Sequence, residues 1–292
     1  MISKKKIGLL LLEIFAIIVF IIFISPLFLV IMNAAKSNGQ IILDPLAIPE
    51  NWGLLFQNVK AVLSDRAVNY SSSFISSVVI TICSLVTITI ISSMCAWSIT
   101  RNKSKFSTIV YLMFVAAMVI PFQVIMFPLV SWFRTLSQNV TLPLMGFNLL
   151  RSYPGMILAY TGFGMAMSVF MLSGFIKGIP VTIEQAAEID GASKWQVFIY
   201  IILPMLKPII VTVVILNGIW IWNDFLLPLL ILGKGNAIQT LPLAVSNFAG
   251  AYTKQWDLIL TSTLLAIIPV LIVFLFGQKH IIKGMTDGAI KS

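Results

Sequence analysis

Six long apolar stretches dominate this sequence, and each is long enough to cross the hydrocarbon core of a membrane as a helix. They run Ile7 to Met32, Phe74 to Ile99, Thr108 to Phe133, Met156 to Ile176, Ile209 to Leu232 and Leu258 to Phe276. Only 10% of the residues are charged, whereas soluble domains run near a quarter. The alternating ten-residue segments typical of membrane barrels are absent from the sequence. The chain is therefore predicted to be an all-α membrane protein with six transmembrane helices.

The basic residues indicate which ends of these spans face the cytoplasm. If the amino terminus is cytoplasmic, twelve of the nineteen Lys and Arg residues fall in inner segments, as the positive-inside rule requires. We therefore predict that both termini are cytoplasmic and that Asn33 to Ser73 lies outside, with Lys36 in water. The same pattern explains the net charge of +9 without nucleic acid. Three tryptophans near span ends are predicted interfacial anchors: Trp97, Trp132 and Trp256.

The inner segment between the fourth and fifth spans carries the signals of a first short helix. Thr182 with Gln185 three residues later forms a capping box, which predicts that a helix starts there. Gly191 suits the left-handed backbone conformation that ends many helices. A helix between Thr182 and Asp190 is therefore expected.

A second short helix is predicted directly after the first. Ser193 with Gln196 forms another capping box, and the helix is expected to run to Leu203, before Pro204. Two helices joined at Asp190 and Gly191 form a hairpin.

The surface of the first helix indicates what such a hairpin could contact. Ala186 and Ala187 provide a small-residue surface flanked by Glu184 and Glu188. A helix lying in the headgroup layer would instead carry Lys and Arg on its polar face. The acidic character of this stretch favours docking to a protein partner over lying in the membrane surface.

The hairpin resembles the cytoplasmic signature of the binding-protein-dependent ABC transporter permeases, written E-A-A, three residues, G, nine residues, I-x-L-P. The match is Gln185 to Ala187, Gly191 and Ile201 to Pro204, with every spacing kept. The family's leading Glu is replaced by Gln185, so charge offered to an ATPase must come from Glu184, Glu188 or Asp190. The resemblance implies these ATPase-coupling residues: Glu184, Gln185, Ala186, Ala187, Glu188, Asp190, Gly191, Leu203 and Pro204.

The resemblance covers roughly Ser72 to Ser292 and extends to the sugar-importing branch, that of the maltose-system G subunit. The stretches that carry it are IPFQVIMFPL, WNDFLLPL and the tail GMTDGAIKS. We accordingly expect residues 1–71 to hold the first span and an extracellular segment. Residues 72–292 are expected to form the type I permease domain, with the coupling hairpin at 180–208.

The resemblance implies a permease subunit of an ATP-driven importer that moves a carbohydrate, an oligosaccharide, across a prokaryotic cytoplasmic membrane by alternating access. Its expected partners are a second homologous permease, two ATPase subunits, an extracellular solute-binding protein and membrane lipid. The chain has no phosphate-binding loop, so ATP and Mg²⁺ are expected on the ATPase, and this chain is predicted to be neither an enzyme nor a cofactor protein. The alternative is a secondary transporter or channel subunit that works without an ATPase.

Polar residues inside the spans are candidates for the solute path, because burying them in lipid is costly. Asn223 and Asp224 lie in the fifth span beside Trp220, a combination of hydrogen-bonding groups and an aromatic face that suits sugars. Hydrogen bonding between helices explains the same residues equally well. With one histidine, His280, no metal site is predicted.

Overall fold

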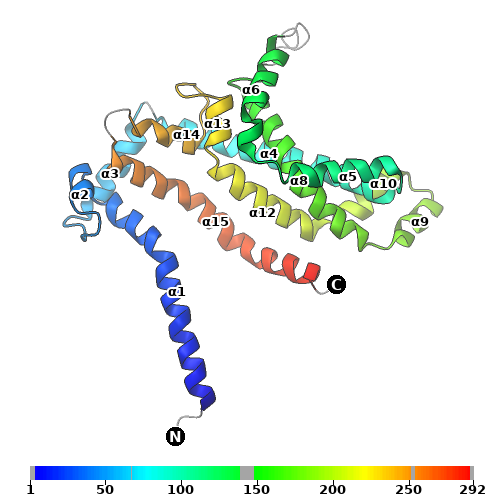
Figure 1. Ribbon diagram of the computed structural model, residues 1–292, viewed down its shortest axis with the longest axis horizontal. Helices are drawn as coiled ribbons and strands as arrows, with labels where there is room; N and C mark the ends of the chain where they lie inside the picture. The colour runs from blue at the N-terminus through cyan, green and yellow to red at the C-terminus, as the bar shows by residue number, and fades with distance from the viewer. Residues whose placement is uncertain (1–3, 67, 139–147, 251–253, 290–292) are drawn as a thin grey trace. The chain divides into compact units, whose positions relative to one another are not determined.

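The computed structural model describes residues 4–66, 68–138, 148–250 and 254–289 (Figure 1). The end of the tail, residues 290–292, and part of the outer loop after the third span therefore lie outside the described residues. Within the described ranges every regular element is a helix, and the helices are joined by turns and irregular segments, with an isolated β-bridge between Ala249 and Lys254. The all-α prediction is confirmed. Two compact units are present, residues 1–71 with 244–268 and residues 72–243 with 269–292.

The first unit begins with a long helix whose described side chains are buried only at its carboxyl end, at Met32 to Ala34. α1 covers Lys4–Ala34, and none of its apolar window is buried by the rest of the chain. Such a surface needs lipid or another apolar partner. The other helices with residues in this unit are α2 (Asn38–Leu43), α3 (Gly53–Ser64), α14 (Leu241–Val245), the 3₁₀-helix η2 (Ser246–Phe248) and the first part of α15 (Trp256–Ala289).

The prediction that Lys36 is solvated was wrong. Only 2% of the residue is exposed. Its ammonium group donates hydrogen bonds to Asn33 Oδ1 at 3.1 Å and to the carbonyl oxygens of Asp44 and Pro45 at 3.0 and 3.3 Å. Three acceptors satisfy the three donors of an ammonium group, so Lys36 stabilises the turn after α1 and does not face water.

The second unit is built around the helix of the fourth span. Half of the apolar window of α8 is buried, against 28% of that of α4. Thr87 of α4 and Thr161 of α8 share a hydrogen bond of 2.7 Å, and Asn217 of α12 donates to Ser168 of α8 at 3.1 Å. These contacts join three helices inside the apolar layer, where polar groups need partners. The apolar helices of this unit are α4 (Tyr70–Arg101), α5 (Lys105–Ala117), α6 (Phe122–Gln138), α8 (Tyr153–Lys177) and α12 (Lys207–Asn223), with the short α13 (Leu226–Ile231).

Two predicted spans differ from the structure. The third, predicted as one helix, consists of α5 and α6, which meet at 110° across residues 118–121 (Figure 1). Pro121 lacks the N–H that a continuous helix needs there. The fifth ends at Asn223, because the chain leaves the helical conformation at Asp224 before α13 begins.

The number of membrane crossings stays a prediction. Three helices, α1, α4 and α8, are long and apolar enough to cross a membrane individually, and up to five crossings result if each bent pair is one span. The apolar stretch Trp256–Ile272 of α15 is shorter than these.

Candidate functional site

The predicted hairpin is present in the second unit, where α9 leads away from the end of α8 (Figure 1). Its first arm is α9 (Val181–Ile189). Its second arm comprises α10 (Lys194–Val197), a π-helical turn (Phe198–Ile202) and α11 (Leu203–Met205). This second arm meets α12 at an angle of 72°.

Gly191 makes the turn between the two arms, as predicted. Its φ is +88°, in the left-handed region that side chains with a Cβ disfavour. The N–H of Ala192 donates to the carbonyl of Ala187 at 2.9 Å, and the N–H of Gly191 donates to that of Glu188 at 3.1 Å. This pair of bonds is the Schellman arrangement, and it satisfies the carbonyls of Ala187 and Glu188 at the end of α9.

One of the two predicted capping boxes is correct. Ser193 accepts a hydrogen bond from the N–H of Gln196 at 3.3 Å, and the Gln196 side chain accepts from the N–H of Ser193 at 2.8 Å. The box at Thr182 was wrong, because α9 begins at Val181 with Pro180 as its N-cap and no side-chain cap. Thr182 thus lies inside the first turn.

The second arm continues past its predicted end. The helix was expected to stop at Leu203, but it runs through Pro204 to Met205. The N–H of Leu203 reaches back five residues to the carbonyl of Phe198, which is π-helical bonding. Pro204 has no N–H that would need a hydrogen-bond acceptor, so it is tolerated within the first turn of α11.

The Glu184 side chain is buried against other residues of this chain. The residue is 6% exposed. Its Oε1 accepts a hydrogen bond of 2.6 Å from Nε of Arg101, the last residue of α4, and its Oε2 accepts one of 3.0 Å from Nε1 of Trp97. Nη2 of Arg101 also lies 2.6 Å from Oε1. Both carboxylate oxygens are therefore used inside the chain.

The same end of α4 contacts both arms of the hairpin. Arg101 also donates to the carbonyl of Ile179, just before α9, at 3.0 Å. The ring of Trp97 lies 5.3 Å from that of Phe198 in the second arm. Removing one partner of a buried ion pair typically destabilises a protein by about 3–5 kcal/mol. Trp97, which the sequence predicted to lie at the membrane interface, thus makes an internal contact. The three side chains that hold the hairpin to α4, those of Trp97, Arg101 and Glu184, are called the anchor below.

Sequence reasoning missed Trp97 and Arg101 as part of this site. They lie four residues apart at the carboxyl end of α4 and so share one face, which is the local signal that was available. Their partner Glu184 lies 83 residues beyond Arg101, and nothing in the sequence joins the two.

The remaining predicted coupling residues of α9 form its outer surface. Gln185, Ala186, Glu188 and Asp190 are exposed, and Ala187 is half-buried. Ile189 has 86% of its surface exposed. In the sequence Ile189 lies between two exposed acidic residues, Glu188 and Asp190. In the second arm, Leu203 is half-buried and Pro204 is exposed.

The predicted solute-path residues lie apart from the hairpin and have different surroundings. Trp220 borders a cavity of about 440 Å³ and makes an edge contact with the ring of Tyr160 at 5.4 Å. Asp224 accepts hydrogen bonds from Tyr160 Oη at 3.1 Å and from the N–H of Leu226 at 3.0 Å. Asn223 is exposed and donates to its own helix at the carbonyl of Ile219. Asp224 thus joins α8 to the break after α12.

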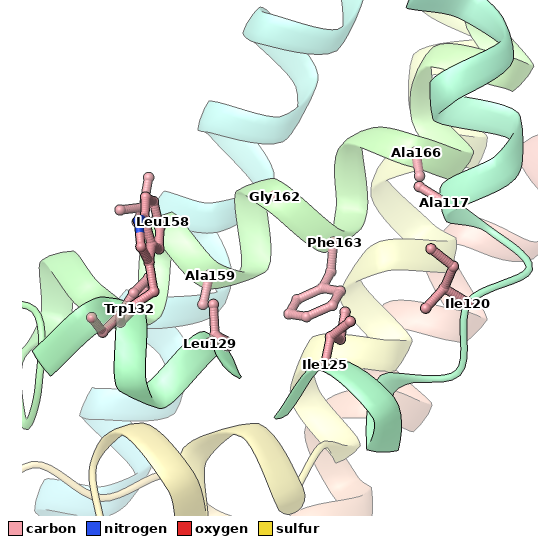
Figure 2. Close-up of a pocket in the computed structure, with 11 residues that line it drawn as sticks. Ala117, Ile120, Ile125, Leu129, Trp132, Leu158, Ala159, Gly162, Phe163 and Ala166 are labelled. Carbon is pink, nitrogen blue, oxygen red and sulfur yellow. The ribbon is translucent and has the colours of Figure 1, made fainter. Parts of the chain in front are cut away.

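A second cavity of about 350 Å³ adjoins the first along α8 and shares Phe163 with it. Figure 2 shows Phe163 projecting from α8 toward Ile125, with Ile120 on the link between α5 and α6. Both cavities are lined by apolar and aromatic side chains, and Asn217 adds an amide group to the lining of the larger one. Aromatic faces with few polar groups are typical of small-molecule sites.

The fold and hairpin are those of a transport permease, and the sequence of residues 88–287 matches the family of binding-protein-dependent transport system inner membrane components. The chain belongs to this family. It is a membrane-embedded transport subunit and not an enzyme.

Among its relatives is the probable starch degradation products transport system permease protein AmyC of Thermoanaerobacterium thermosulfurigenes, 36% identical over 96% of both chains. The multiple sugar-binding transport system permease protein MsmG of Streptococcus mutans is 35% identical over 93% of both. A chain of a bacterial ABC transporter that imports the acidic polysaccharide alginate shares the fold, with a TM-score of 0.72, 18% identity and coverage of 96% and 98%. A second structure, of an alginate ABC transporter in complex with alginate pentasaccharide-bound periplasmic protein, has a TM-score of 0.68 and 17% identity over 94% and 93%.

Proposed function

We propose that this chain is one of two permease subunits of an importer that carries an oligosaccharide into a prokaryotic cell by alternating access. The relatives AmyC and MsmG are named for starch degradation products and multiple sugars. Their similarity extends over nearly the full length, which supports a shared substrate class. Both termini are proposed to face the cytoplasm, on the same side as the hairpin.

The observation that carries the proposal is the hairpin, held firmly to α4 on its inner side and exposed on its outer side. We assign the outer surface of α9 to the ATPase contact, with Ile189 as its apolar centre and Glu188 and Asp190 as its charges. Glu184 belongs to the coupling site through its hold on the hairpin. ATP and Mg²⁺ are bound by the two ATPase subunits, and no cofactor is assigned to this chain.

The partners follow from the same assignment. The exposed apolar length of α1 and the exposed apolar side chains of α5 and α6, among them Leu112 and Phe127, provide surface for lipid and for a second permease. An extracellular binding protein would deliver the sugar, by analogy with the alginate ABC transporter, whose complex holds an alginate pentasaccharide-bound periplasmic protein.

Reconstitution tests this function directly. The chain is placed in proteoliposomes with a candidate partner permease, ATPase and binding protein, and uptake of labelled maltotriose and raffinose is followed. We expect uptake that requires ATP on the ATPase side of the membrane and the binding protein on the other. Uptake without ATP, driven by an ion gradient, would instead establish the secondary-transporter alternative.

For the solute path we propose Trp220, with Asn223 and Asp224 at the helix break above it. Trp220→Ala is expected to raise the KM of uptake about fivefold, since an aromatic face contributes about 1 kcal/mol. Trp220→Phe should retain most of the affinity. Ile219 is the matched control, because it precedes Trp220 on α12, is equally exposed at 39% and does not line either cavity. An unchanged KM in Trp220→Ala, or an equal change in Ile219→Ala, would remove Trp220 from the path.

A further inference from the structure

We infer that Arg101 and Trp97 are positioning residues that fasten the hairpin to α4, so that hairpin and α4 move as one body during transport. The inference rests on the proposed function for its transport consequence, and on contacts within this chain for its structural part.

The first step is that the anchor joins elements the backbone does not join. α9 follows α8 through residues 178–180, and the second arm leads into α12. α4 is not adjacent to the hairpin in the chain, because α5, α6 and α8 lie between them. Its contact is made by Arg101, which binds Glu184 and the carbonyl of Ile179, and by Trp97. A displacement of α9 is therefore passed to α4 by side chains.

The second step is that this contact is stiff. The ion pair is short, at 2.6 Å, with side-chain exposures of 17% and 8% for Arg101 and Glu184. Water therefore screens it weakly. Each carboxylate oxygen of Glu184 accepts from a different donor, which fixes the orientation of the group as well as its place.

The third step is that the anchor holds both arms together. Trp97 donates to Glu184 in α9 and packs on Phe198 in the second arm. Trp195 of α10 also stacks on Phe198, with ring centroids 5.9 Å apart. A push on the outer surface of α9 therefore moves the arms together against α4 and does not open the hairpin.

The helix ends favour the same arrangement electrostatically. Arg101 lies in the last turn of α4, where the helix dipole favours a cation, and Glu184 lies in the first turn of α9, where it favours an anion. The charges of the pair thus have a second source of stabilisation, and an inverted pair would lose it.

The structural arm of the test needs no ATPase. In the purified chain in nanodiscs, Arg101→Met is expected to raise amide hydrogen exchange in residues 186–192 about tenfold or more, because the hairpin opens locally once released. Lys103→Met is the matched control, since it removes an exposed cation two residues away. Unchanged exchange in Arg101→Met would overturn the inference whatever the ATPase does.

The transport arm uses the reconstituted importer in which the unaltered chain supports ATP-dependent uptake. Glu184→Gln and Arg101→Met are each expected to lower the solute carried per ATP hydrolysed by about tenfold or more, with the ATPase still co-purifying. The double variant should be no worse than either single one, because both remove the same contact. Arg101→Lys and Trp97→Phe should be intermediate.

An unaltered ratio of uptake to hydrolysis in both single variants would overturn the inference while leaving the proposed function in place. Loss of ATPase co-purification in step with transport would also overturn it, because the anchor would then serve only to fold the docking surface.

Discussion

Gly191→Val is expected to abolish most coupled transport while leaving the chain inserted in the membrane. At φ +88°, a residue with a Cβ is strained by about 1–2 kcal/mol, and a β-branched one has the least freedom to adapt. That strain changes the population of the native turn by roughly 5- to 30-fold. Binding-protein-stimulated ATP hydrolysis and uptake in proteoliposomes measure the effect.

The control for this variant is Gly191→Asn. Space does not separate the two substitutions, since a Cβ at this position meets no atom within 4 Å. Asparagine adopts the left-handed conformation more readily than any β-branched residue, so it should retain most of the coupling. Equal losses of coupled transport in both variants would show that the added side chain, and not the backbone conformation, is the cause.

Gly155→Ala is expected to prevent the second unit from folding. Gly155 lies in the first turn of α8, where an added Cβ would lie 1.6 Å from the carbonyl oxygen of Leu149 and 2.6 Å from its carbon. Those are backbone atoms that cannot turn aside, and Leu149 is itself buried in the core. The expected outcome is loss of the monodisperse peak in fluorescence-detected size-exclusion chromatography.

Gly174→Ala in the same helix is the matched control, because a Cβ there meets nothing within 4 Å. Alanine is favoured over glycine in a helix interior by up to about 1 kcal/mol, so this variant should be as stable as the parent or more so. A folded Gly155→Ala protein with an unchanged melting temperature would mean that the turn before α8 can move away.

Local sequence signals predicted the parts of the fold that depend on local physics. The apolar runs indicated the positions of α1, α4 and α8, and the Ser193 box and Gly191 indicated the turn of the hairpin. Thr182 failed as a cap although its pattern was equally good, because Pro180 already directs the chain into a helix one residue earlier. Two competing local signals lay side by side, and the proline determined the start.

The parts that sequence reasoning missed depend on distant contacts. Whether Pro121 would kink a helix gently or turn it by 110° depends on what α5 and α6 pack against. Likewise Glu184 and Glu188 look alike in the sequence, one turn apart on an acidic helix. Only the position of Arg101 in space distinguishes the buried acid from the exposed one.

The break between α5 and α6 has a consequence for hydration. α5 has 13 residues and α6 has 17, about 20 and 26 Å of helix, so neither spans an apolar layer about 30 Å thick. Turn bonds from Met118 to Val115 and from Val119 to Ala116 satisfy part of the freed backbone. The remainder needs water or protein, because lipid offers no hydrogen bonds.

Both cavities border this break, through Ala117 and Ile120. Water in these cavities can therefore form hydrogen bonds with the backbone groups that are left free at the break. If the cavities dried when the importer closed, those groups would have to find partners in protein or the bend would have to straighten. The hydration of the cavities and the angle between α5 and α6 are thus expected to change together.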